Sequence, residues 1–508
     1  MNTDHIPWVP STERSVAPLL FFLCDDLAYE ERPLNRTLKL GWTQRQDRRA
    51  FLKFLVTGTA GMSLLAACGG ASTPPPASAT NQKATGAATT APAGAAGAAT
   101  TAPAQAAPAQ KAAGATSSVR LHIRSGPYND VWTKVGEQLF TPKFSNVQLK
   151  FEPYPAGELT QKVETMASAG TIGDLYFTNT YMMDHQRLGA LGVAKAIDDY
   201  AKRDTIKWDD WFKVAVDQLY ANGKLYGMLD GASPGRAGLY YSKDAFEAAG
   251  VPEPDETWTL DKLVDVGTKF TKDGGFAFKP TYGLAPETLI WLRAFGGDVY
   301  SKDGKKATLT TPESRKGLDW LYQGTHKLKI FPKPDQMQDG ISTLFAAKKL
   351  AMFNSGTWDA NMANSTKVKW GLAPLPKGPT GVRGSMAEAN TICLTTASKN
   401  PDMAWEFAKM DASRDGGIFH LDLGVTPGGR PDVYGDPKVQ QQYFWMKVWS
   451  KVWEEALPFG GPANFRGSEA SDTLKQGLDP LWLGSSAPDG GAVDKTNDAI
   501  QKILDKTV

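Results

Sequence analysis

The chain has 508 residues and a formal net charge of +2, and hydrophobic residues make up 41% of it. A charge so near zero gives no reason to expect a nucleic acid or an acidic surface as a partner. With only three cysteines, the chain is not a small scaffold held together by disulfides.

Residues 47–68 indicate export. Arg48 and Arg49 precede a short apolar run that ends in Leu65-Ala66-Ala67-Cys68. A basic region, an apolar core of about 7–15 residues and small residues at a cleavage point make a secretory signal, not a membrane span. The arginine pair resembles a twin-arginine signal, with Asp47 where Ser or Thr is usual, and the last four residues resemble a bacterial lipobox. We expect a lipidated Cys68 at the mature N-terminus, anchored to the outer face of the cell membrane.

The segments on either side of this signal differ in character. Residues 69–118 consist almost entirely of Ala, Thr, Pro, Gly, Ser and Gln, which cannot bury enough apolar surface to fold. They predict a disordered tether; an ordinary interdomain linker is less favoured, because no folded domain fits before it. Residues 1–46 are of doubtful status, either an extension of the signal or the product of a start codon assigned too early.

Residues 119–508 alternate between strand and helix patterns, which predicts an α/β fold. This length suits two lobes better than one core. Cys393 lies in an apolar strand and is expected to be buried. Trp445, Trp449 and Trp453 recur every four residues, which indicates one buried helix face. The expected strands are 119–123, 147–152, 174–177 and 239–241. The expected helices are 131–144, 159–168, 188–197 with glycine breaks, 243–249, 258–272, 315–328, 401–410 and about 493–504.

The order of short motifs from about Arg120 to the C-terminus resembles the family 1 extracellular solute-binding proteins of carbohydrate ABC transporters. Each motif is weak alone, and their shared order carries the resemblance. Two departures are Ser242, where the family usually has Asn, and Ile172-Gly173, where a Pro often precedes the Asp. The motifs are Gly173-Asp174-Leu175-Tyr176-Phe177, Gly223-Lys224-Leu225-Tyr226-Gly227, Tyr240-Tyr241-Ser242-Lys243-Asp244, Phe295-Gly296-Gly297-Asp298, Ser355-Gly356-Thr357-Trp358, Ala373-Pro374-Leu375-Pro376-Lys377-Gly378 and Ala404-Trp405-Glu406-Phe407.

The resemblance implies a two-lobed, type II-like periplasmic-binding-protein fold with a hinge and with ligand held between the lobes. We expect lobe 1 to span about 119–233 and 390–428, and lobe 2 about 236–387 and 430–508. The implied function is capture of a sugar or oligosaccharide by a monomer and delivery to an ABC transporter permease. It implies no cofactor, no metal, no catalytic residue and no nucleic acid.

Candidate ligand-binding residues lie mostly in loops at predicted strand ends, where open α/β sheets bind ligands. A sugar needs an aromatic plate for its apolar face and polar partners for its hydroxyls. In the related family the residue matching Trp358 faces the ligand. The candidates are Ser125, Tyr128, Thr178, Asn179, Tyr181, Arg236, Glu287, Trp291, Trp358, Glu388, Asn390 and Phe465.

An enzyme is disfavoured, because the folded part has no nucleophile elbow, zincin motif, P-loop or dinucleotide fingerprint. The five histidines do not show metal-ligand spacing. The 54 acidic residues leave open a pair of carboxylates like that of a glycosidase. The alternatives to a transport protein are therefore a tethered carbohydrate-binding lectin and a glycoside-processing enzyme.

Overall fold

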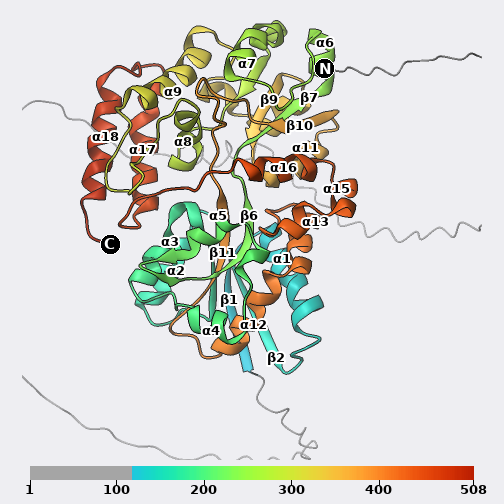
Figure 1. Cartoon of the computed structure of the whole chain (residues 1–508), viewed down its shortest axis with the longest axis vertical. Coiled ribbons are helices and arrows are strands. Elements are labelled where there is room, and N and C mark those ends of the chain that lie inside the picture. The colour runs from blue at the N-terminus through green and yellow to red at the C-terminus, as the bar shows by residue number, and fades with distance from the viewer. Residues whose placement is uncertain (1–116) are drawn as a thin grey trace, which may run out of the picture. The chain divides into compact units, whose positions relative to one another are not determined.

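The computed structural model describes residues 117–508. The predicted signal with Cys68, and all of the predicted tether before Ser117, lie outside the described residues. Two mixed sheets organise the described part, one below the other in Figure 1. We call the half built on the five-stranded sheet lobe 1 and the half built on the four-stranded sheet lobe 2. The predicted two-lobed α/β fold is confirmed.

Lobe 1 has the strand order β2-β1-β3-β11-β6. Strands β1, β2 and β3 are parallel, so their carboxyl ends share one edge, and β11 runs antiparallel to both β3 and β6. The strands are β1 (Ser117–Arg124), β2 (Val147–Tyr154), β3 (Leu175–Asn179), β6 (Met228–Ser233) and β11 (Glu388–Leu394). The helices are α1 (Pro127–Val135), α2 (Leu159–Ser168), α3 (Asp184–Ala190), α4 (Asp198–Arg203), α5 (Lys213–Val216), α12 (Pro401–Asp411) and α13 (Arg414–Asp422). A small hairpin joins β4 (Tyr220–Ala221) and β5 (Lys224–Leu225).

Lobe 2 has the strand order β10-β7-β9-β8. Only the β8–β9 pair is parallel in this sheet. The strands are β7 (Gly238–Ser242), β8 (Phe276–Lys279), β9 (Leu350–Ser355) and β10 (Trp370–Pro374). The helices are α6 (Lys243–Ala249), α7 (Leu260–Gly267), α8 (Ala285–Ala294), α9 (Pro312–Tyr322), α10 (Gly340–Ala346), α11 (Ala360–Ser365), α17 (Gly467–Trp482) and α18 (Gly491–Leu504).

The chain passes between the sheets at residues 234–237, 375–387 and 423–430. The first two passages touch. A Cβ added to Gly235 would lie 2.1 Å from the carbonyl oxygen of Met386, and Gly235 has a φ of +70°. Glycine is the residue that tolerates both conditions, since it has no Cβ and adopts positive φ freely.

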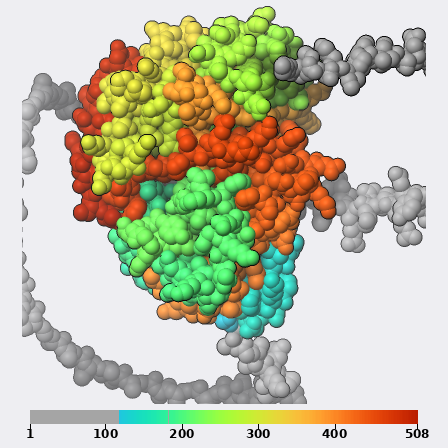
Figure 2. All heavy atoms as spheres, in the orientation of Figure 1, coloured from blue at the N-terminus to red at the C-terminus, as the bar shows by residue number. Residues whose placement is uncertain are grey.

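Three helices follow the third passage and lie between the lobes: α14 (Pro431–Tyr434), α15 (Pro437–Gln442) and α16 (Trp445–Glu454). Figure 2 shows this part of the chain as a red-orange band across one face. The three tryptophans of α16 are buried, which confirms the predicted helix face. Trp453 stacks on Phe212 of lobe 1 at 4.2 Å between ring centroids, and Trp449 packs on Gly238 of lobe 2. The band therefore joins both lobes by apolar contact.

Most predicted elements occur, with shifted ends. The predicted helix at 188–197 is wrong in its position, because α3 begins at Asp184 and ends before Gly192, whose φ is +76°. The predicted helix at 131–144 begins earlier, at Pro127, a residue favoured in a first helical turn. The predicted helix at 258–272 begins only at Leu260, where the Thr259 side chain accepts from Lys262 N–H.

Candidate ligand-binding site

A cavity of about 310 Å³ lies where the lobes meet. Its walls come from the end of β1, the start of α1, the end of β3, the first passage, the turn after β9, the start of β11 and the third passage. The lining residues are Arg124, Ser125, Pro127, Tyr128, Asn179, Arg236, Trp358, Glu388, Asn390, Gly424, Val425 and Thr426. A volume of about 300–1,000 Å³ is usual for small-molecule sites.

The structure brings together more than half of the candidates named from sequence. Several of them lie together because β1 and β3 are parallel neighbours and end at the same edge of the sheet. The candidates that line this cavity are Ser125, Tyr128, Asn179, Arg236, Trp358, Glu388 and Asn390.

Hydrogen bonds fix the lobe 1 wall of the cavity. Asn390 Nδ2 donates to Tyr128 Oη at 3.1 Å, and that hydroxyl shares a further hydrogen bond of 3.1 Å with Thr426 Oγ1. Asn179 Nδ2 donates to Asn390 Oδ1. Burial raises the pKa of Tyr128, so its phenol stays protonated at neutral pH. These polar groups are thereby held in fixed directions, which suits recognition of ligand hydroxyls.

Arg236 organises the opposite wall. Its Nη1 lies 3.4 Å from both carboxylate oxygens of Glu388, and its Nη2 lies 3.4 Å from Glu287 Oε1. Its guanidinium carbon lies 5.2 Å from the ring centroid of Trp358, within the range of a cation–π contact. Burial raises the pKa of Glu388, while the Arg236 charge acts in the opposite direction.

Glu287 acts through Arg236 and does not line the cavity. Its Oε2 accepts from the Leu284 N–H at 3.3 Å, at the start of α8. The carboxylate therefore links Arg236 to the start of α8 and helps to hold the guanidinium near the Trp358 ring.

Trp291 does not lie at the cavity, so its prediction as a ligand contact needs correction. Its side chain is completely buried in lobe 2, and its indole N–H donates to the Thr281 carbonyl at 2.6 Å. The ring stacks on Trp320 at 5.2 Å. Helix α8 is buried on nearly every side, so the sequence offered no polar face from which to deduce which residue points to the cleft.

A second cavity, of about 510 Å³, adjoins the first and shares Arg124 and Asn179 with it. The candidates Thr178 and Phe465 line this second cavity. Its other residues come chiefly from α2, α3 and the start of α17. The side chain of the candidate Tyr181 lies outside the described part of the structure.

Sequence reasoning missed Arg124 and Thr426 among the cavity residues. Arg124 is the last residue of β1, directly before the candidate Ser125, so the strand-end rule could have found it. Thr426 lies in the third passage, near the end of the predicted lobe 1 and not directly after a predicted strand. Its role at Tyr128 depends on a contact across 298 residues, and no local pattern carries that information.

Two α/β lobes with an aromatic and polar cavity between them define a two-lobed binding protein. A family model described as bacterial extracellular solute-binding protein matches residues 138–443, and the chain belongs to this family. A protein of Brucella abortus named as a binding protein is 26% identical over 380 residues, which cover 72% of this chain and 87% of the relative.

Solved structures share the fold. The ABC substrate-binding protein Lmo0181 of Listeria monocytogenes, in complex with cycloalternan, has a TM-score of 0.68 at 19% identity and covers 77% of this chain and 99% of its own. The maltose-bound MalE3 of T. maritima has a TM-score of 0.65 at 22% identity, with 76% and 99% covered. Within residues 117–508, none of the helices has the length and apolar character needed to cross a bilayer.

Proposed function

We propose that this protein captures a sugar or an oligosaccharide between its lobes and delivers it to the permease of an ABC transporter. The observation that carries the proposal is the half-buried Trp358 ring on one side of the cavity and the Tyr128–Asn390–Asn179 hydrogen-bond network on the other. An aromatic ring suits the apolar face of a sugar, and amide and phenol groups suit its hydroxyls.

The adjoining cavities support a ligand of more than one ring. They meet at Arg124 and Asn179, so a chain of sugars that begins at Trp358 can extend toward Phe465. The similar solved proteins carry cycloalternan and maltose by their names, which favours this ligand class for the present chain. We infer binding without turnover, since the family of this chain is described as solute-binding and the similar Listeria protein is named a substrate-binding protein.

The proposal also includes a lipid anchor at Cys68. The Leu65-Ala66-Ala67-Cys68 motif and the Ala/Thr/Pro-rich segment after it support tethering by a lipid on Cys68 to the outer face of the membrane. Mass spectrometry of the membrane fraction tests this part: the expected N-terminal peptide begins at a lipidated Cys68. A soluble protein that keeps residues before Cys68 would contradict it.

A thermal-shift screen against neutral sugars, oligosaccharides, polyols and unrelated small solutes tests the ligand class. A ligand at about 100 times its dissociation constant stabilises the folded state by about 2.7 kcal/mol. We expect a saccharide to raise the melting temperature of the wild type and to raise it less for Trp358→Ala. A shift by another solute class, with no shift by any saccharide, would overturn the sugar assignment.

Two further measurements separate the alternatives. Chromatography of the ligand after prolonged incubation should recover it unchanged, whereas hydrolysis products would indicate a glycoside-processing enzyme. Uptake of labelled ligand by cells should fail when the gene is deleted. Uptake that persists after deletion would favour a lectin.

A further inference from the structure

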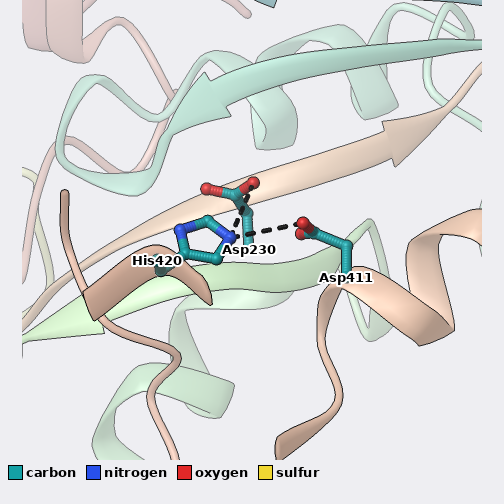
Figure 3. A group of neighbouring side chains, drawn as sticks. All are labelled: Asp230, Asp411 and His420. Atoms are coloured by element: carbon teal, nitrogen blue, oxygen red, sulfur yellow. Dashed lines mark hydrogen bonds and ion pairs between the residues drawn. The ribbon is translucent and has the colours of Figure 1, made fainter. Parts of the chain in front are cut away.

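Three buried side chains in lobe 1 converge behind the ligand cavity. Asp230 lies on β6, Asp411 ends α12, and His420 lies on α13. Figure 3 shows the three pointing toward one another, and each is 0% exposed. One ligand atom from each lies within 4.8 Å of the others.

The cluster lacks a balancing charge. In residues 117–508 neither carboxylate makes a salt bridge to lysine or arginine, and His420 is the one basic partner of both. Unpaired charges are costly away from water, so two carboxyl groups buried together must either keep their protons or share a cation.

Unsatisfied atoms mark the same place. Asp230 Oδ2 and Asp411 Oδ2 are buried and have no hydrogen-bond partner. Asp230 Oδ1 accepts from the Trp132 indole N–H at 2.6 Å. Buried polar atoms are nearly always satisfied in native proteins, so two unpartnered carboxylate oxygens in one buried cluster point to a missing partner.

The geometry points to a divalent first-row metal ion, with Zn²⁺ as the best match, bound by Asp230, Asp411 and His420. Zn²⁺ takes carboxylate oxygen and imidazole nitrogen at about 2.0–2.2 Å, which places neighbouring ligand atoms about 3–3.5 Å apart. His420 Nε2 lies 3.2 Å from Asp411 Oδ1 and 3.8 Å from Asp230 Oδ1. All three ligand atoms lie within 4.8 Å of one another, so side-chain adjustment can bring them onto one ion, and bidentate carboxylates would also engage the free Oδ2 atoms.

The position of the ion suggests what it does. It would tie β6, α12 and α13 together directly under the wall of the ligand cavity. The carbonyl of His420 accepts from the Val425 N–H at 3.0 Å, and Val425 and Thr426 line that cavity. Trp132 on α1 would hold the Asp230 ligand in place, as outer partners of metal ligands do. The ion would thus be structural, with no part in covalent chemistry.

Metal analysis of the purified full-length protein tests the site. We expect about one equivalent of Zn²⁺ per chain after dialysis, a lower melting temperature after treatment with EDTA, and recovery when Zn²⁺ is added back. Mn²⁺ should compete less well, because the imidazole ligand favours zinc. Trp132→Phe should weaken Zn²⁺ binding by about 10–100-fold, the usual effect of losing an outer-shell partner.

Matched variants keep the test decisive even where a substitution impairs folding. Asp411→Asn and His420→Gln should lose the metal, whereas His185→Gln should retain it. His185 is an equally buried histidine of lobe 1, bonded to the Gln218 carbonyl at 2.8 Å. Wild-type protein that contains no metal, and whose melting temperature responds to neither EDTA nor Zn²⁺, would overturn the proposal. The Asp230 and Asp411 carboxyl groups would then be buried in their protonated form.

Discussion

The Arg236 guanidinium carbon lies 5.2 Å from the centroid of the Trp358 ring, and the same guanidinium pairs with Glu388 and Glu287. This contact joins the first passage between the lobes to the turn after β9. The ring therefore has one face toward a cation that two carboxylates hold in place. The rest of the half-exposed ring is available to a ligand, so the contact orients the residue on which the proposed stacking depends.

Trp358→Ala should weaken ligand binding by about 1–3 kcal/mol, with aromatic stacking on nucleic acid bases as the nearest measured analogue. Stability without ligand should change little, because the side chain is only half-buried. Calorimetric titration and a denaturation curve on the same variant measure both effects. Trp208→Ala, which truncates another half-buried tryptophan away from the cavity, is the control. A strongly destabilised Trp358→Ala that keeps wild-type affinity would rule out the stacking role.

Tyr128→Phe should lower affinity and also cost stability. The change removes the hydroxyl that links Asn390 to Thr426. It leaves two polar groups without their partner, which costs about 1–3 kcal/mol when they are buried. Isothermal calorimetry and urea denaturation give the two quantities. The control is Tyr241→Phe, which removes a phenol bond to Glu253 in lobe 2, away from the cavity. Equal loss of affinity in both variants would show that the loss does not depend on the Tyr128 hydroxyl in the cavity.

Stability should fall as pH rises through about 6 because of Asp184. Burial raises the pKa of this carboxyl to about 6, and hydrogen bonds from Thr160 and Ser468 oppose the shift only in part. Nearby Glu164 adds to the rise and Arg187 opposes it. The folded state thus binds this proton more tightly than the unfolded state does. Its contribution is complete below about pH 4 and is lost as pH passes the folded pKa.

The rise from 3.8 to about 6 corresponds to about 3 kcal/mol. Urea denaturation of wild type and Asp184→Asn between pH 4 and pH 7.5 measures this component as the difference between the two curves. We expect the wild type to lose about 2 to 2.5 kcal/mol relative to the variant across this range, since part of the unfolded carboxyl is already ionised at pH 4. Parallel curves would show that Asp184 titrates normally.

Gly238→Ala should destabilise the protein by about 1–3 kcal/mol, the usual cost of overpacking a core. A Cβ at this position would lie 2.3 Å from the Trp449 ring, where α16 packs on the start of β7. Thermal and urea denaturation measure the loss. Gly491→Ala at the start of α18, where an added Cβ meets no atom within 4 Å, should leave stability unchanged or slightly raised. A Gly238→Ala variant as stable as the wild type would show that α16 can shift to accommodate the added methyl group.

The sequence alone determined the alternation of strands and helices, because apolar spacing and turn residues are local properties. It placed β1, α2, α6 and α12 to within two residues at either end. It also located most of the cavity candidates, since parallel strands end at a common edge and the residues after them are readable in chain order.

Tertiary structure alone decided which of those residues meet. Trp358 and Trp291 both follow turns in the sequence, yet one lines the cavity and the other lies in the core of lobe 2. Thr426 reaches Tyr128, and Asp230 meets His420, across long stretches of chain. These contacts depend on how strands pair and helices pack at a distance, and the local pattern of the chain does not encode that.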